Sequence, residues 1–211
     1  MPDISIINLN AVSIYLMEIE FSQLEYYQSS FTRLEQEKIQ AIGNPGKKLE
    51  YAASRYLKHH IFGAKNIAYD STGAPYIEGV GFISLSHSQT YVAMALCSDH
   101  LIGVDIEEIR EKSVKLSQRF ITEAEKELFD QNDQTAMSTL WSLKECLYKL
   151  SDRKQLLFQK DILVYKRNGI LCGSILKTNG IYEYELQVEH FRNILISFNS
   201  GKGKLIHEHS I

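Results

Sequence analysis

The sequence has few cysteines, and their arrangement suggests neither a disulfide framework nor a metal site. Its 211 residues include only Cys97, Cys146 and Cys172, an odd number with no Cys-x-x-Cys pair. Disulfide scaffolds and structural zinc sites need paired, closely spaced ligands, so neither is indicated. We expect three small buried thiols in a reducing compartment.

The chain also lacks an excess of positive charge and a long apolar run. Its net charge is −3 and its pI is about 6.2, which argues against a protein that binds nucleic acid through bulk charge. The uncharged run over residues 4–17 contains two asparagines and is shorter than the roughly 20 apolar residues of a membrane span. No basic stretch precedes it, as one would in a signal peptide. We therefore expect a cytoplasmic protein with no membrane partner and no nucleic-acid partner.

Apolar periodicity predicts helices and antiparallel strands in both halves of the chain. The break at Asn44-Pro45-Gly46 separates two predicted helices, and Thr122 with Glu125 forms a capping sequence for another that ends at Phe129. The predicted helices cover residues 21–42, 47–62, 112–120 and 135–150. The predicted strands cover residues 4–16, 81–86, 91–97, 101–106, 157–164, 169–176, 181–188 and 193–198. The polar tail from Ser200 is expected to fray. This order indicates an α+β fold whose halves, 1–99 and 100–211, have similar composition.

The first candidate site is the segment Ile102-Gly103-Val104-Asp105-Ile106-Glu107. On a strand, Gly103, Asp105 and Glu107 share one face. Two neighbouring carboxylates repel unless a cation or solvent separates them, and oxygen ligands favour Mg²⁺ or Mn²⁺. Gly103 would leave room for a bulky ligand. The alternative is a solvated acidic edge that continues through Glu108.

The second candidate is the predicted helix around Trp141-Ser142-Leu143-Lys144-Glu145-Cys146-Leu147-Tyr148-Lys149. Trp141, Glu145 and Lys149 lie four residues apart and therefore share one face. Glu145 would add a third oxygen to the cation, while Lys149 and Lys144 would neutralise phosphate oxygens. The alternative is an ordinary surface Glu–Lys pair, worth about 0.3–0.5 kcal/mol.

The third candidate is Ser84-Leu85-Ser86-His87-Ser88, at the end of a predicted strand. Its hydroxyls, imidazole and backbone amides are suitable donors to an anion. A Ser-His hydrolase is disfavoured, because the sequence has no G-x-S-x-G and adjacent strand residues point to opposite faces. The alternative is ordinary turn chemistry.

Together these segments resemble the surfactin-type branch of the 4′-phosphopantetheinyl transferase superfamily. The recurring pattern of that family is S-H-S at a strand end, then G-V-D-I-E, then a helix with W-x-x-K-E-x-x-x-K. These elements stand here at residues 86–88, 103–107 and 141–149. Arg119-Phe120 followed by Glu123 or Glu125 looks like the R-F-x-x-x-E stretch of the family. The resemblance covers roughly residues 44–165.

The resemblance implies two pseudo-symmetric lobes, each with helices packed on a small antiparallel sheet, and a cleft between them that binds coenzyme A. It implies a monomer that uses Mg²⁺ and coenzyme A to modify an acyl or peptidyl carrier protein. The metal ligands would be Asp105, Glu107 and Glu145. The catalytic residues would be Glu145, Lys149 and His87. The contacts to coenzyme A would be Arg55, Lys47, Lys48, Ser86, His87, Lys144 and Lys149.

One position departs from the family pattern. The family usually has Gly-Lys-Pro where this chain has Gly73-Ala74-Pro75. The missing cation would cost on the order of 1.5–3 kcal/mol of phosphate binding if no other lysine replaced it. An impaired member that only binds coenzyme A or a carrier protein is therefore an alternative to the transferase.

A third hypothesis is a metal-dependent phosphoesterase that uses the same acidic cluster. It is disfavoured because no histidines stand at metal-ligand spacing around that cluster.

Lys112, Lys115 and Arg119 would form a basic helical face that attracts the carrier protein. The alternative is an ordinary solvated helix face. The sequence does not identify the carrier.

Overall fold

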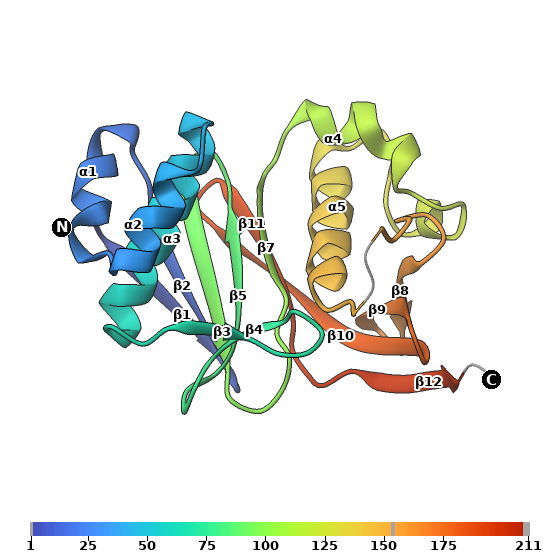
Figure 1. The fold of residues 1–211 in the computed structure, drawn as a ribbon. Coiled ribbons are helices and arrows are strands. Elements are labelled where there is room, and N and C mark those ends of the chain that lie inside the picture. The colour runs from blue at the N-terminus through green and yellow to red at the C-terminus, as the bar shows by residue number, and fades with distance from the viewer. Residues whose placement is uncertain (1, 153–154, 209–211) are drawn as a thin grey trace.

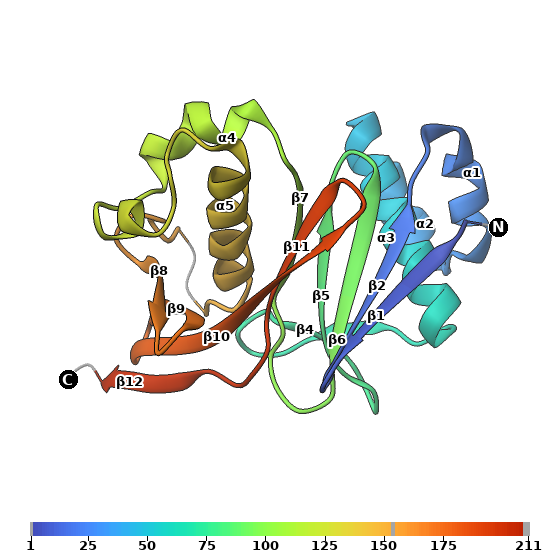
Figure 2. The same cartoon turned by 180° about the vertical axis from the view of Figure 1, so that it is seen from behind.

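The computed structural model describes residues 2–152 and 155–208, and these form two antiparallel sheets with five α-helices, α1–α5 (Figures 1 and 2). The first sheet has the strand order β1-β2-β6-β5-β4-β3, and the second has the order β7-β11-β10-β9-β8 with β12 paired to β10. The predicted α+β class is confirmed. The strands are β1 (Ile4–Leu9), β2 (Val12–Glu18), β3 (Ile67–Tyr69), β4 (Pro75–Ile77), β5 (Gly81–His87), β6 (Tyr91–Cys97), β7 (Val104–Glu108), β8 (Ile162–Arg167), β9 (Ile170–Lys177), β10 (Gly180–Phe191), β11 (Ile194–Asn199) and β12 (Lys204–Glu208). The helices are α1 (Leu24–Tyr27), α2 (Arg33–Gln40), α3 (Pro45–Phe62), α4 (Glu111–Leu116) and α5 (Gln134–Lys149).

The helix α3 covers one face of the first sheet. It begins where Asn44 accepts a hydrogen bond from the Lys47 amide and Pro45 occupies the first turn, so the Asn-Pro-Gly break is a helix start. Its buried residues Ala52, Ala53 and Leu57 pack with Met94 and other side chains of β2 and β6. Small residues on this face allow the helix to approach the sheet closely.

The helix α5 has the same position in the second half. Its N-cap, Asp133, accepts a hydrogen bond from the Ala136 amide. Leu140, Leu143 and Leu147 are fully buried against the second sheet and the segments that precede the helix. In both halves a helix therefore packs on an antiparallel sheet, as predicted. The division into two lobes, 1–99 and 100–211, stays a proposal.

A third apolar cluster joins the two sheets. Val12, Ile14 and Leu16 of β2 pack with the buried residues of β6, and this face meets Ile106 of β7 and Ile196 of β11. β6 is buried on both faces, which explains its near-continuous apolar sequence. The contact places β5 beside β7, and the candidate site lies along these two strands.

Several predicted elements are wrong in detail. The expected strand over 4–16 is a hairpin whose turn contains Asn10 at φ 53°, a left-handed conformation that asparagine tolerates. The expected helix over 21–42 is divided into α1, α2 and 3₁₀ turns. The capping pair Thr122–Glu125 is present, but a 3₁₀ turn, Ala124–Glu127, follows it. The tail predicted to fray from Ser200 contains β12, which pairs with β10.

None of the helices in the described part of the chain is long and apolar enough to cross a membrane.

Candidate functional site

The site is built where the start of β7 meets α5. A Cβ atom on Gly103 would lie 2.4 Å from the Cys146 carbonyl oxygen, so the helix backbone fills the space beside this glycine. The expectation that Gly103 leaves room for a ligand is therefore wrong. Its lack of a side chain instead allows α5 to approach β7, which brings Asp105 near Glu145 and Lys149.

Asp105 is the central carboxylate and is buried. Its Oδ1 accepts hydrogen bonds from the Ser86 hydroxyl, at 2.9 Å, and from the Lys149 ammonium, also at 2.9 Å. Its Oδ2 is buried and has no hydrogen-bond partner among the described residues. An unpaired buried carboxylate oxygen is costly, so this atom marks a place where a cation or a donor fits.

Two further carboxylates respond electrostatically to Asp105. Burial, and then the charge of Asp105, raise the pKa of Glu145 to about 7, although Lys149 opposes the shift. Burial and Asp105 also raise the pKa of Glu107, while a hydrogen bond from Trp141 Nε1 to Glu107 Oε1, at 3.0 Å, lowers it. Three carboxylates that disfavour one another's charge form an environment that a divalent cation would stabilise.

The donor set fits Mg²⁺, but the described residues do not hold three such ligands converged on one point. No group of three or more His, Cys, Asp or Glu side chains within residues 2–152 and 155–208 is arranged to hold a metal ion. Trp141 holds Glu107 through its indole N–H. We nevertheless keep Asp105, Glu107 and Glu145 as the proposed ligand set. Two observations support it: Asp105 Oδ2 has no partner among the described residues, and the pKa values of Glu107 and Glu145 are raised.

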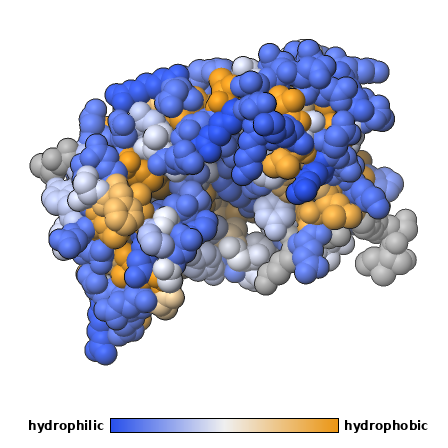
Figure 3. All heavy atoms as spheres, turned by 90° about the horizontal axis from the view of Figure 1, so that it is seen from above, coloured by the Kyte–Doolittle hydropathy of each residue, from blue (hydrophilic) through white to orange (hydrophobic). Residues whose placement is uncertain are grey.

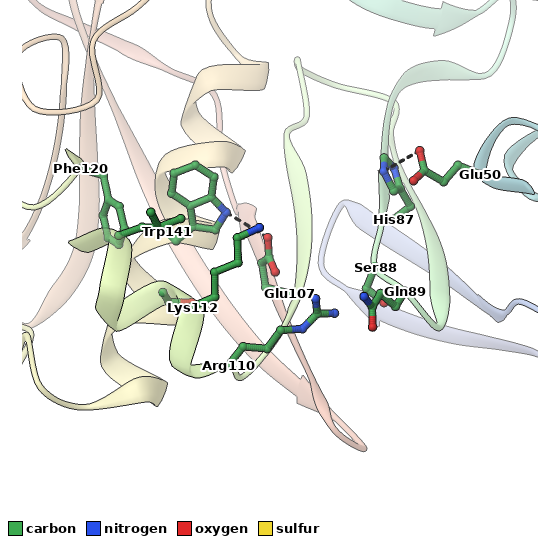
Figure 4. A pocket seen from close by; sticks show the side chains of 11 residues that line it. Glu50, His87, Ser88, Gln89, Glu107, Arg110, Lys112, Phe120 and Trp141 are labelled. Atoms are coloured by element: carbon green, nitrogen blue, oxygen red, sulfur yellow. Dashed lines mark hydrogen bonds and ion pairs between the residues drawn. The ribbon is translucent and has the colours of Figure 1, made fainter. Parts of the chain in front are cut away.

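A cavity of about 440 Å³ opens beside Glu107, the one of these three carboxylates that lines it (Figure 4). His87, at the end of β5, lies on one side, and its Nε2 is 2.9 Å from Glu50 Oε2 on α3. Glu107 and Trp141 lie on the opposite side. Burial lowers the pKa of His87, and Glu50 opposes that effect. Both halves contribute to the lining, which consists of Glu50, His87, Ser88, Gln89, Glu107, Arg110, Lys112, Ser113, Leu116, Phe120 and Trp141.

The two serines of β5 tie the first sheet to β7. The Val104 and Ile106 amides donate to the hydroxyls of Ser84 and Ser86, at 3.0 and 3.2 Å. The Ser86 hydroxyl in turn donates to Asp105, so its proton is already used in this structure. Ser86 is therefore placed to orient Asp105, while any phosphate contact that it makes stays a prediction.

The expected phosphate contact of Lys144 is wrong in this structure. Its side chain is fully buried, and Nζ donates to the carbonyl oxygens of Phe120, Phe158 and Ile162 at 2.7–3.1 Å. Nζ also lies 2.8 Å from Glu125 Oε2, which is equally buried. Lys144 lies on the face of α5 that packs into the second lobe. The motif residues around Arg119-Phe120 therefore include a structural ion pair, made by Glu125 and not by the exposed Glu123.

The expected coenzyme A contacts Arg55, Lys47 and Lys48 lie on α3. Arg55 Cζ stacks 4.9 Å from the centre of the Tyr51 ring, and its buried Nη1 has no described partner. Lys47 is exposed, pairs with Glu50 at 3.0 Å and lines a second cavity of about 360 Å³ together with Ser86 and His87. Lys48 is half-buried on α3. Their roles toward coenzyme A remain predictions.

Two residues of the cavity were not predicted from the sequence. Glu50 pairs with both His87 and Lys47, and Arg110 pairs with Glu108 at 2.6 Å and lines the cavity. Glu50 stands in an ordinary helical sequence 37 positions before His87, so no local signal connects them. Arg110 stands two positions after Glu108, with Ile109 between them, and that proximity was the available signal.

These arrangements can be compared with known families. Residues 101–198 match the family model ACPS, 4′-phosphopantetheinyl transferase superfamily. The matched segment contains Asp105, Glu107, Glu145 and Lys149, and it does not include Arg55 or the Ser-His-Ser segment. The surfactin-type branch stays a prediction. A search of curated proteins finds no match to the chain.

Proposed function

We propose that this protein transfers 4′-phosphopantetheine from coenzyme A to a serine of an acyl or peptidyl carrier protein. One observation carries the proposal. Within the segment that matches the transferase superfamily, Asp105 contacts Lys149 and raises the pKa of Glu145, and one oxygen of Asp105 has no partner among the described residues. This combination of acidic oxygens and an ammonium suits a metal-bound pyrophosphate.

Asp105, Glu107 and Glu145 would hold Mg²⁺ in this proposal. When bound, Mg²⁺ would neutralise negative charge that develops as the phosphoanhydride breaks. Ser86 would orient Asp105 through its hydroxyl, and Trp141 would orient Glu107 through its indole N–H. Such supporting hydrogen bonds fix the direction of a ligand before the metal arrives.

The carrier serine attacks the β-phosphorus of coenzyme A, the one that bears pantetheine. A bond forms from the serine oxygen to phosphorus, and the bond from phosphorus to the oxygen bridging to the adenosine portion breaks. The leaving group is 3′,5′-adenosine bisphosphate. Glu145, or a water that it orients, would take the serine proton.

Lys149 and His87 would stabilise the pyrophosphate oxygens and the leaving group. Lys149 is fixed by the Val104 carbonyl, at 2.6 Å, and by Asp105. His87 faces the cavity from the opposite sheet, on the first-lobe side. Groups held on two different elements would be positioned before the reaction and would need little rearrangement during it.

The carrier protein would dock on the side of the molecule that carries α3 and α4. Seen from above, this side is mainly hydrophilic with separate hydrophobic patches (Figure 3). Lys112, Lys115 and Arg119 are exposed there, at and just beyond α4, and Lys115 pairs with Glu111 at 3.1 Å. An acidic carrier would be attracted to this local basic group, although the chain as a whole is acidic. Because an apolar cluster joins the two lobes within one chain, we propose that the protein acts as a monomer.

The second candidate is a protein that binds coenzyme A or a carrier without transfer, and Ala74 favours it. Titration calorimetry with coenzyme A and Mg²⁺, paired with a transfer assay on several apo carrier proteins, separates the two. Binding with formation of the holo carrier supports the transferase. Binding without transfer to any carrier supports the second candidate, and an absence of binding rejects both.

A further inference from the structure

Glu50, on α3, carries a carboxylate to which the proposed mechanism gives no role. Its Oε2 lies 2.9 Å from His87 Nε2, at the end of β5, and 3.0 Å from Lys47 Nζ on its own helix. One oxygen therefore stands between an ammonium and an imidazole. Figure 4 shows this carboxylate directed at His87, and both residues line the cavity.

The start of α3 sets the position of Glu50. Asn44 caps the helix by accepting a hydrogen bond from the Lys47 amide, and Lys47 and Glu50, three residues apart, then lie on one side of it. The Lys47 ammonium donates to Glu50 Oε2. The Glu50 side chain is 26% exposed, against 64% for Lys47, so the carboxylate is the more enclosed member of the pair. Contacts from α3 and from β5 thus hold it beside the cavity.

His87 stands in surroundings that favour its neutral form. Burial lowers the pKa of His87, and the ammonium groups of Lys47 and Lys149 lower it further. Glu50 is the strongest influence in the opposite direction, ahead of Asp105. A neutral imidazole has one N–H and no charge, whereas the imidazolium has two N–H groups and a positive charge. Only the charged form adds electrostatic stabilisation to an anion, so Glu50 supports the form of His87 that the proposed reaction needs.

The other charged groups around His87 do not replace Glu50. They come from α3 (Lys47), from β7 (Asp105 and Glu107), from α5 (Lys149), and from the N-cap and first turn of α4 (Arg110 and Lys112). Within the described part of the chain, no hydrogen bond or ion pair joins His87 to any of the three proposed metal ligands. Among the described carboxylates, Glu50 is the one that pairs with this imidazole.

We propose that Glu50 is a positioning residue, which holds His87 at the wall of the cavity and supports its positive charge during transfer. This role rests on the proposed function, in which His87 stabilises the pyrophosphate oxygens and the leaving group. Glu50 acts through His87 and touches neither the substrate nor the metal.

The test combines NMR titration of the His87 imidazole with transfer rates measured from about pH 6 to about pH 8, the range in which histidine titrates. The chain has seven histidines, so His87→Asn identifies the His87 signal by its loss. Glu50→Gln removes the charge and keeps the shape, while Glu50→Asp keeps the charge. Glu25→Gln, at an exposed glutamate of α1 outside the cavity, is the matched control. Circular dichroism verifies folding.

Glu50→Gln should lower the pKa of His87, because the carboxylate that opposes the effect of burial is gone. Lys47→Met should move it in the opposite direction. Transfer by Glu50→Gln should be about 2- to 5-fold slower than transfer by the unaltered protein near pH 8, as for a partly exposed ion pair. The difference should narrow as the pH falls, since His87 is then protonated in both proteins. Glu50→Asp should lie closer to the unaltered protein, and Glu25→Gln should change nothing.

The ratio of the two rates is compared because the other titrating groups of the cavity are common to both proteins. An unchanged His87 pKa in Glu50→Gln overturns the inference and leaves the transferase proposal untouched. A rate ratio that is the same at every pH also overturns it, because a merely structural effect of the substitution does not follow the titration of His87. If the unaltered protein transfers to no carrier, the proposed function is rejected and the role of Glu50 falls with it.

Discussion

The ammonium of Lys149 lies 2.9 Å from Asp105 Oδ1 and 2.6 Å from the Val104 carbonyl oxygen. This contact joins the last turn of α5 to β7, at the helix end where the macrodipole favours a cation. It leaves the second oxygen of Asp105 without a partner. The relationship between Lys149 and Asp105 therefore defines both the charge of the site and the direction of its central carboxylate.

Lys149→Met should slow phosphopantetheine transfer by at least about 10-fold, because a charge-assisted contact to Asp105 and to the substrate is lost. The fold should persist, since the lysine is partly exposed at the helix end and the Ser86 hydroxyl still donates to Asp105. The measurement is the steady-state rate of transfer to an apo carrier. A rate equal to that of the unaltered protein would remove Lys149 from the mechanism.

Lys144→Met should act on stability. The substitution leaves the buried carboxylate of Glu125 without its ion-pair partner. Breaking such a pair costs about 3–5 kcal/mol of unfolding free energy. Urea unfolding followed by tryptophan fluorescence measures the loss. Adding Glu125→Gln should recover part of it, because the stranded charge is then gone. A stable Lys144→Met variant with impaired coenzyme A binding would instead support the original expectation of a phosphate contact.

Gly103→Ala should destabilise the protein and lower its activity together. The new Cβ would lie 2.4 Å from the Cys146 carbonyl oxygen, so α5 must move away from β7. Overpacking of this kind costs about 1–3 kcal/mol. Gly43→Ala, where a Cβ meets nothing within 4 Å, is the matched control in the same thermal and transfer assays. Equal behaviour of the two variants would contradict the close approach of β7 and α5.

Acid should weaken the first lobe through Glu35. Burial alone would raise the pKa of Glu35. The Glu35 side chain, however, accepts hydrogen bonds from His59 and Thr32 and pairs with Lys58, and these contacts lower its pKa to about 2. Because the folded-state pKa lies below the unfolded one, this stabilisation is present above about pH 4.5 and is lost as the pH falls toward 2.

About 2 kcal/mol of this stabilisation should be gone near pH 3. Burial lowers the pKa of Lys58 despite Glu35, so the desolvation of the ammonium offsets part of what the pair contributes. The pH dependence of unfolding should therefore be flatter in Glu35→Gln than in the unaltered protein. Parallel curves for the two proteins would show that Glu35 contributes nothing to acid stability.

The sequence was most informative where chemistry and periodicity agreed. Asp105 and Glu107 alternate on β7, and Trp141, Glu145 and Lys149 recur every four residues on α5, so each set was predicted from its own element. What joins the two sets is the absence of a side chain on Gly103, and its contact with α5 depends on tertiary packing that local sequence does not encode. The sequence therefore identifies the glycine but not the helix that packs against it.

Lys144 shows the same limit of local sequence. Lys144 stands beside Glu145 in the motif, but one position on a helix rotates a side chain by about 100°, which turns it into the core. The β12 pairing and the division of residues 21–42 were likewise decided by packing against neighbours and not by propensity.

The most direct test of the central claim is intact-mass measurement of apo carrier protein after incubation with this protein, coenzyme A and Mg²⁺. EDTA and Glu145→Gln are compared with Glu127→Gln, an exposed glutamate outside the cavity. The account predicts the gain of one phosphopantetheine group with the unaltered protein and with Glu127→Gln, and no gain with EDTA or Glu145→Gln. Full transfer by Glu145→Gln, or no transfer by the unaltered protein to any carrier despite coenzyme A binding, would contradict it.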